Sequence, residues 1–117
     1  MAVYIIAEAG VNHNGRLDLA LRLCDVAKAA GVDAVKFQTW KTEKIVTQTA
    51  AKATYQVENT HSNEETQFDM LKKLELSYRQ FFEIKEYCDK IGIDFFPHPM
   101  RKTVWIFLSA CIFLSLK

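Results

Sequence analysis

Two charged side chains interrupt or end apolar stretches of the 117-residue sequence. Glu8 closes the run Val3–Glu8, and Lys36 lies within the run Val32–Gln38. An ammonium group is very costly to bury without a partner, so a lysine inside a strand implies a bound anion or a carboxylate partner. The residue pattern alone leaves two interpretations open, a structural ion pair with Glu8 or an anion-binding lysine.

Three further polar side chains are candidates for contacting a substrate. Gln38 lies on the same side of its predicted strand as Lys36, and we expect it to position a reactant because an amide neither accepts nor releases protons at neutral pH. Asn12 and His13 belong to the polar turn Asn12–Gly15 that follows the first apolar run. The same residue types also favour a turn and a helix cap without any ligand. A substrate-binding role and a purely structural role therefore both stay open for these two residues.

The predicted elements bring these residues together. The pattern of apolar residues predicts a strand at Val3–Glu8, a helix at Leu17–Ala30 and a second strand at Val32–Gln38. Asn14 is expected to cap the start of the helix, and Gly31 to follow its end. Strand, helix and strand in this order form a βαβ unit, which implies parallel strands and a right-handed crossover. Chemistry is then expected at the carboxyl ends of the strands.

A polar connection from Thr39 to Asn63 separates this unit from the next helical pattern. It is longer than an ordinary connection from strand to helix, which indicates a functional or partly disordered segment. Trp40 and Tyr55 are expected to pack this connection. His61 within it, and His98 further along, show no metal-ligand spacing to another histidine.

Two capping-box patterns predict helices in the second half of the chain. Each consists of a serine followed three residues later by a glutamate or glutamine. The predicted elements are a helix that starts at Ser62–Glu65 and runs to about Lys73, a helix from Ser77–Gln80 to Ile91 closed by Gly92, and a third strand at Ile93–Phe96.

Composition and charge narrow the class of protein. The length suffices for one domain, and a hydrophobic content of 50% can supply a core. A net charge of +1 gives no electrostatic case for binding nucleic acid or an anionic membrane. Cys24, Cys88 and Cys111 lack metal-site spacing and are expected to be free thiols. Together with the lack of a signal-peptide pattern, they predict a cytoplasmic protein.

Four motifs in order resemble the sialic acid synthase family, which includes the N-acetylneuraminate, legionaminate and pseudaminate synthases. They are IAEAGVNHNG, DAVKFQT, MLKKLELS and GIDFF, and the resemblance covers Val3–Phe96. Members of this family have a (β/α)₈ TIM barrel followed by a small antifreeze-like domain. A barrel needs roughly 250 residues. The resemblance therefore implies an α/β fold, an incomplete barrel made of its first three parallel strands and their helices.

The resemblance also implies a reaction. Family members condense phosphoenolpyruvate with an N-acylated hexose such as N-acetylmannosamine to give a nonulosonic acid. C3 of phosphoenolpyruvate attacks the open-chain aldehyde, water adds at C2, and phosphate leaves. The family uses a divalent metal, Mn²⁺ or Mg²⁺, that polarises the aldehyde, and its members pair as homodimers. The metal-binding histidines of the family come from later strands, so we expect no metal ligands in this chain.

Residue roles follow from the same resemblance. Lys36 is expected to hold the phosphate or carboxylate of phosphoenolpyruvate, and Glu8 to orient the acceptor sugar, which makes these two the predicted catalytic residues. Gln38, Asn12 and His13 are predicted to bind substrate beside Lys36. Proximity and electrostatics would then supply much of the rate.

The sequence departs from the family pattern after Phe96. Residues 97–117 contain two prolines, a basic pair and an apolar run that is too short to span a membrane. Moving the reading frame by one nucleotide allows the family's Ser-Thr-Pro and acidic stretch, so we interpret residues 1–96 as the N-terminal part of the barrel and 97–117 as a frameshifted tail. The chain is then expected to be an inactive truncated fragment. Two alternatives are an inert or merely binding fragment, and an aldolase in which Lys36 forms a Schiff base.

Overall fold

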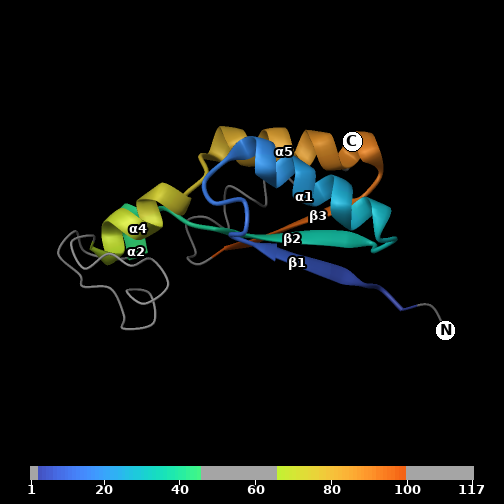
Figure 1. Ribbon diagram of the computed structural model, residues 1–117, viewed down its shortest axis with the longest axis horizontal. Coiled ribbons are helices and arrows are strands. Elements are labelled where there is room, and N and C mark those ends of the chain that lie inside the picture. Colours follow the sequence, from blue (N-terminus) through green and yellow to red (C-terminus); the bar gives the residue numbers. More distant parts are fainter. Residues whose placement is uncertain (1–2, 46–65, 100–117) are drawn as a thin grey trace.

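The computed structural model describes residues 3–45 and 66–99. Its elements, in chain order, are β1 (Ile6–Gly10), α1 (Leu17–Ala29), β2 (Ala34–Thr39), α2 (Thr42–Ile45), α4 (Gln67–Leu74), α5 (Tyr78–Ile91) and β3 (Asp94–Pro99). The strands form one parallel sheet in the order β1-β2-β3. Helices α1 and α5 lie together on one face of the sheet, and α2 and α4 lie beyond the carboxyl ends of the strands (Figure 1). The predicted α/β fold with parallel strands is confirmed.

The core lies between the sheet and the two long helices. In β2, Val35 and Phe37 are buried on the side that faces α1 and α5, whereas Lys36 and Gln38 alternate to the opposite side. We call this opposite side the second face of the sheet. The helices contribute one buried stripe each to the core: Ala20, Cys24 and Ala27 from α1, and Phe81, Ile84 and Cys88 from α5.

No helix within residues 3–45 and 66–99 combines the length and the apolar character needed to cross a lipid bilayer.

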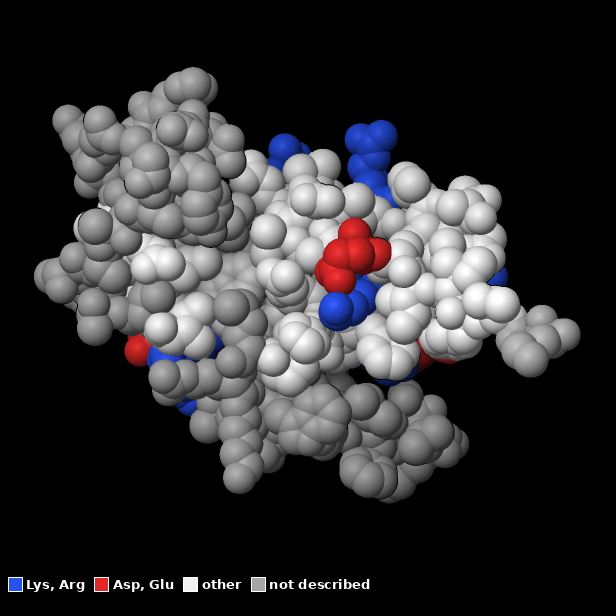
Figure 2. Space-filling view, turned by 90° about the horizontal axis from the view of Figure 1, so that it is seen from below, with Lys and Arg blue, Asp and Glu red and all other residues white. Residues whose placement is uncertain are grey.

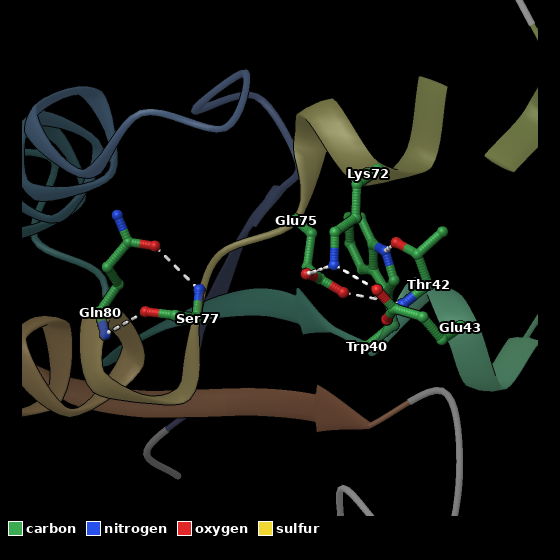
Figure 3. A network of polar contacts seen from close by, with 7 residues as sticks. All are labelled: Trp40, Thr42, Glu43, Lys72, Glu75, Ser77 and Gln80. Carbon is green, nitrogen blue, oxygen red and sulfur yellow. Dashed lines mark hydrogen bonds and ion pairs between the residues drawn. The ribbon is translucent and has the colours of Figure 1, made fainter. Parts of the chain in front are cut away.

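Both predicted ends of α5 are confirmed. The Ser77 hydroxyl accepts a hydrogen bond from the backbone N–H of Gln80, and the Gln80 side chain accepts one from the backbone N–H of Ser77 (Figure 3). Gly92 ends the helix in the left-handed conformation. Gly31, which follows α1, also has a positive φ, as predicted.

One predicted helix start is wrong. The N-cap of α1 is Arg16 rather than Asn14, and Arg16 makes no capping hydrogen bond through its side chain. Asn14 has a φ of 54° and lies inside the turn, where its backbone is already left-handed and cannot lead directly into a helix. The start of α4 is Gln67, and its capping box is formed by Thr66 and Asp69. The Ser62–Glu65 box lies outside the described residues.

The third strand is longer than predicted. It was expected to end at Phe96, where the sequence departs from the family pattern and two prolines follow, but β3 continues to Pro99. In this sheet β3 is paired on one side by β2, and such an edge position tolerates proline. Residues 97–99 therefore belong to the sheet, whereas 100–117 lie outside the described residues. The frameshift origin of the tail stays a prediction.

A polar network fixes the segment that leaves β2. Trp40 is buried and its indole N–H donates to the Thr42 hydroxyl (3.1 Å), while the Thr42 backbone N–H donates to Glu75 Oε1 (2.8 Å). Lys72 then bridges Glu75 and Glu43, with Nζ to carboxylate distances of 3.0 and 2.5 Å. Figure 3 shows these side chains converging from α2, α4 and the segments beside them. The network connects α2 to α4 at the carboxyl end of β2. Tyr55 and His61, which the sequence placed in the same connection, lie outside the described residues.

The turn after β1 packs closely on the end of α4. Gly15 has a φ of 76°, and a Cβ atom at this position would lie 1.9 Å from the Lys73 carbonyl oxygen. Only glycine fits here, because the position has a left-handed backbone conformation and leaves no space for a side chain. Gly31 has a similar φ of 80°, but a Cβ atom there would meet nothing within 4 Å.

This contrast predicts unequal effects of two alanine substitutions. Gly31→Ala should lower the free energy of unfolding by roughly 1–2 kcal/mol, the cost of a left-handed non-glycine residue. Gly15→Ala should lower it by roughly 1–3 kcal/mol more, because the new methyl group also displaces the α4 backbone. Urea unfolding followed by circular dichroism measures both values. Equal losses for the two variants would contradict the close packing of this turn on α4.

Candidate functional site

Glu8 and Lys36 are neighbours on the second face of the sheet. They are register partners in the parallel β1–β2 pairing, and the distance from Lys36 Nζ to Glu8 Oε2 is 3.0 Å. Each is the third residue of its strand, in a β1 of five residues and a β2 of six, so the pair lies near the middle of the strands rather than at their carboxyl ends. The prediction that the two side chains share a sheet face is therefore confirmed, and the carboxylate partner expected for a strand lysine is Glu8.

A β-bulge follows Glu8 directly. The pairing shifts from Glu8 opposite Lys36 to Gly10 opposite Phe37, so Ala9 is the additional residue, and it is buried. Bulges of this kind bend a strand and change the direction of its side chains, often next to active sites. A Cβ atom at Gly10 would lie 3.5 Å from Glu8 Oε1, an ordinary van der Waals contact, so it is the φ of 55° that favours glycine here. The bulge therefore interrupts the regular register directly beside the Lys36–Glu8 pair.

The ion pair is accessible to solvent. The exposed fractions of the side chains are 33% for Lys36 and 52% for Glu8. An ion pair at such exposure stabilises a fold by only about 0–1 kcal/mol. Figure 2 shows the second face, where most of the visible surface of the described residues is uncharged. An anionic ligand that reaches this face can therefore compete with Glu8 for the ammonium group at little cost to the fold.

Gln38 continues the row of polar side chains toward the strand end. Its register partner in β3 is His98, and Lys36 has Phe96 as its partner there. Both β3 residues are exposed. Sequence reasoning gave His98 no role because it assigned residues 97–117 to a tail. Continuing the strand alternation two residues beyond Phe96 would have placed His98 on the second face beside Gln38.

His13 lies apart from this group, in the core. It is fully buried, its ring packs against Phe37 with centroids 6.1 Å apart, and its Nδ1 accepts a hydrogen bond from the Gly15 N–H (3.0 Å). Burial lowers the pKa of His13, so the imidazole is neutral with its proton on Nε2. Asn12 is exposed, and its backbone N–H donates to the Ala9 carbonyl. The structure thus brings Glu8, Lys36 and Gln38 together and keeps His13 with the turn; substrate binding by His13 and Asn12 stays a prediction.

The described residues offer no ligand set for the divalent metal that the resemblance implies. Within residues 3–45 and 66–99, no three His, Cys, Asp or Glu side chains are arranged so that they could hold a metal ion. No chemical step is therefore assigned to a metal held by these residues.

Comparison with known proteins places these features in a family. Residues 23–114 match the model of the NeuB family. The chain is 50% identical over 95 residues to an N,N'-diacetyllegionaminic acid synthase of Legionella pneumophila, covering 81% of this chain and 26% of that protein. It is 44% identical over 95 residues to the protein of the same name from Campylobacter jejuni, covering 81% of this chain and 28% of the relative. The chain thus spans about a quarter of the length of these relatives.

A solved structure shares the fold as well. The crystal structure of an N-acetylneuraminic acid (sialic acid) synthetase from Leptospira borgpetersenii, in complex with citrate, superposes with a TM-score of 0.74 at 31% sequence identity. The match covers 95% of this chain and 34% of that chain. The three parallel strands and their helices therefore correspond to part of a TIM barrel.

The burial of His13 predicts a pH dependence of stability. Unfolded, the imidazole binds a proton near its ordinary pKa of about 6.5, whereas burial lowers the pKa of His13 in the folded chain. The unfolded state then binds more protons just below pH 6.5, so the free energy of unfolding should fall as the pH drops through this range.

His13→Asn should reduce this slope, because the asparagine carbonyl can accept the Gly15 N–H bond without titrating. Urea unfolding at several pH values between 5 and 8 measures the slope. Asn12→Ala, in the same turn but at an exposed position, is the matched control and should keep it. An unchanged slope in His13→Asn would show that burial does not hold this imidazole neutral.

Proposed function

This chain belongs to the NeuB family, and on that basis we propose that it forms the first part of a barrel that condenses phosphoenolpyruvate with an N-acylated hexose. The products of this reaction are a nonulosonic acid and inorganic phosphate. The observation that carries the proposal is the Lys36–Glu8 pair, 3.0 Å apart on the second face of the sheet. The relatives named for legionaminic and sialic acid synthesis support the class of product.

Lys36 is proposed to bind the anionic donor. Its ammonium group lies on the second face with a third of its side chain exposed, and its partner in the fold is a carboxylate. The phosphate or carboxylate of phosphoenolpyruvate is an anion of the same kind and can take the place of Glu8. The exchange keeps the ammonium group paired with an anion throughout. Such pairing is needed because an unpaired charge is very costly in a site that excludes water.

Glu8 and Gln38 are proposed to position the reactants. When the donor takes Lys36, the Glu8 carboxylate becomes free to accept hydrogen bonds from the hydroxyl groups of the acceptor sugar. Gln38 lies on the same face beside Lys36 and can donate or accept through its amide. C3 of phosphoenolpyruvate then attacks the aldehyde carbon, water adds at C2, and phosphate leaves. Held together in this way, the reactants gain chiefly from proximity and orientation.

The remaining parts of the proposed enzyme lie outside this chain. A barrel has eight strands and the described residues form three, so the other strands, a divalent metal site, and the homodimer contacts are proposed to come from the missing length of the family protein. The 117-residue chain by itself is then proposed to be inactive, either inert or able only to bind a ligand.

The Schiff-base alternative is less well supported by the geometry. An amine must be unprotonated to attack a carbonyl carbon. Lys36 Nζ is instead paired with the Glu8 carboxylate at 3.0 Å, a contact that attack on a carbonyl carbon would have to break. Treatment with borohydride in the presence of pyruvate tests this alternative, because a covalent adduct at Lys36, found by mass spectrometry, would support the aldolase and not the synthase.

The role of Lys36 is testable in a chimaera. Residues 1–96 of this chain replace the corresponding segment of the Legionella pneumophila synthase, to which it is 50% identical. Lys36→Ala in the chimaera should raise the KM for phosphoenolpyruvate, lower kcat, and reduce kcat/KM by about a hundredfold, the usual cost of one electrostatic group. Glu8→Gln should act mainly on the kinetics of the acceptor sugar.

Lys90→Ala is the matched control, because Lys90 is an exposed lysine near the end of α5 on the helix side of the sheet. It should leave kcat/KM unchanged within about twofold, as expected for an exposed residue away from the site. A Lys36→Ala chimaera with the kcat/KM of its parent for phosphoenolpyruvate would return Lys36 to the role of a structural ion-pair partner.

The inactivity of the chain alone is a separate prediction. With several electrostatic groups missing at once, each worth roughly 3 kcal/mol, turnover should be undetectable. The assay measures phosphate release from phosphoenolpyruvate with N-acetylmannosamine and Mn²⁺, for the 117-residue chain beside the chimaera. Turnover by the chain within about tenfold of the chimaera would show that three strands suffice and that the proposed division of the site is wrong.

A further inference from the structure

Two thiols touch in the core between the long helices. Cys24 of α1 and Cys88 of α5 are both fully buried, and their sulfur atoms are 3.5 Å apart, with the Cys88 S–H donating to Cys24 Sγ. They lie on the side of the sheet that α1 and α5 cover, whereas the proposed catalytic pair occupies the second face. The proposed reaction therefore has no use for either thiol.

Polar contacts between the same helices hold the two sulfur atoms in place. Next to the thiols, the Tyr87 hydroxyl donates to the Asp25 carboxylate, joining α5 to α1. Toward the end of α5, Lys28 Nζ donates to the Gly92 carbonyl oxygen at 2.9 Å. These two contacts limit sliding of α1 along α5, so the thiols stay opposite each other in the folded chain.

We propose that Cys24 and Cys88 form a redox-sensitive pair, which hydrogen peroxide oxidises to a disulfide that links α1 to α5. A disulfide bond is about 2.05 Å long, so the sulfur atoms must approach by about 1.5 Å from their separation of 3.5 Å. The linkage would close a loop between residues 64 positions apart.

The reaction has two steps and a defined order. The Cys24 thiol loses its proton, its thiolate attacks one oxygen of hydrogen peroxide, and the O–O bond breaks. Cys24 becomes a sulfenic acid, and the hydroxide that leaves takes up the proton to give water. Cys88 sulfur then attacks Cys24 sulfur, the S–O bond breaks, and the hydroxide leaves as a second water with the proton of the Cys88 thiol. Two thiols and one hydrogen peroxide thus give one disulfide and two waters.

The hydrogen bond between the thiols sets this order. It lowers the pKa of Cys24, whose sulfur accepts the bond, and together with burial it raises the pKa of Cys88, which donates it. The thiolate is the nucleophile in such reactions, which makes Cys24 the attacking residue and Cys88 the resolving one. Because both sulfur atoms are buried, peroxide reaches them only when the two helices part transiently.

The selectivity of disulfide formation tests the proposal in the full chain. Hydrogen peroxide is added under native conditions and in 8 M urea, and the linked peptides are identified by mass spectrometry. In the unfolded chain, loop-closure entropy favours Cys88–Cys111, since 111 − 88 gives 23 positions against 64 for Cys24–Cys88, by about fivefold. In the folded chain Cys24–Cys88 should dominate instead. The same distribution in both conditions, or free Cys24 and Cys88 in the native sample, would overturn the proposal.

Two single variants test the order of attack on a Cys111→Ser background. Cys88→Ser should accumulate a sulfenic acid at Cys24, detected as a dimedone adduct, whereas Cys24→Ser should label Cys88 much more weakly. Equal labelling at the two positions would overturn the assignment of Cys24 as the attacking thiol. The oxidised Cys111→Ser chain should also melt at least about 10 °C higher than its reduced form, because the linkage constrains the unfolded state.

Discussion

The packing of α1 and α5 against β2 is the interaction on which the rest of this structure depends. Val35 and Phe37 are buried beneath the two helices, and the Phe37 ring lies about 6 Å from the rings of His13 and Phe95. Strand side chains alternate, so burying these two forces Lys36 to the second face. A shift of one residue in the β2 register would place the ammonium group in the core. The apolar core therefore positions the charged site without touching it.

The two faces of the sheet also differ in how much their side chains stabilise the fold. Burial of a large apolar side chain such as Phe37 stabilises the fold by about 1.5–3 kcal/mol, whereas the exposed pair of Glu8 and Lys36 contributes about 0–1 kcal/mol. The sheet is held by its helix side, and the ion pair can exchange partners with little effect on the fold. A site with this property can give up an internal contact to a ligand, which is what the proposed donor binding at Lys36 requires.

Local rules in the sequence predicted the parts that depend on near neighbours. The βαβ order, the shared face of Glu8 and Lys36, and the Ser77 capping box follow from alternation and short spacings. Where two local signals competed, the prediction failed, because Asn14 adopts the left-handed turn conformation instead of capping α1. Contacts between distant segments, such as the burial of His13 and the contact of Cys24 with Cys88, have no local signal.

The electrostatics of the second face depend on what surrounds it. By Coulomb's law, two unit charges 3.0 Å apart attract by about 1.4 kcal/mol in water and about 5.5 kcal/mol at an effective dielectric constant of 20. Closing a barrel over this face moves the pair from the first regime toward the second, where an unpaired Lys36 becomes costly and an arriving anion is bound more strongly. The isolated sheet keeps the positions of Glu8 and Lys36 but not this low-dielectric setting. The three strands thus fix the positions of Glu8 and Lys36, whereas the strength of their electrostatic interactions depends on the closed barrel.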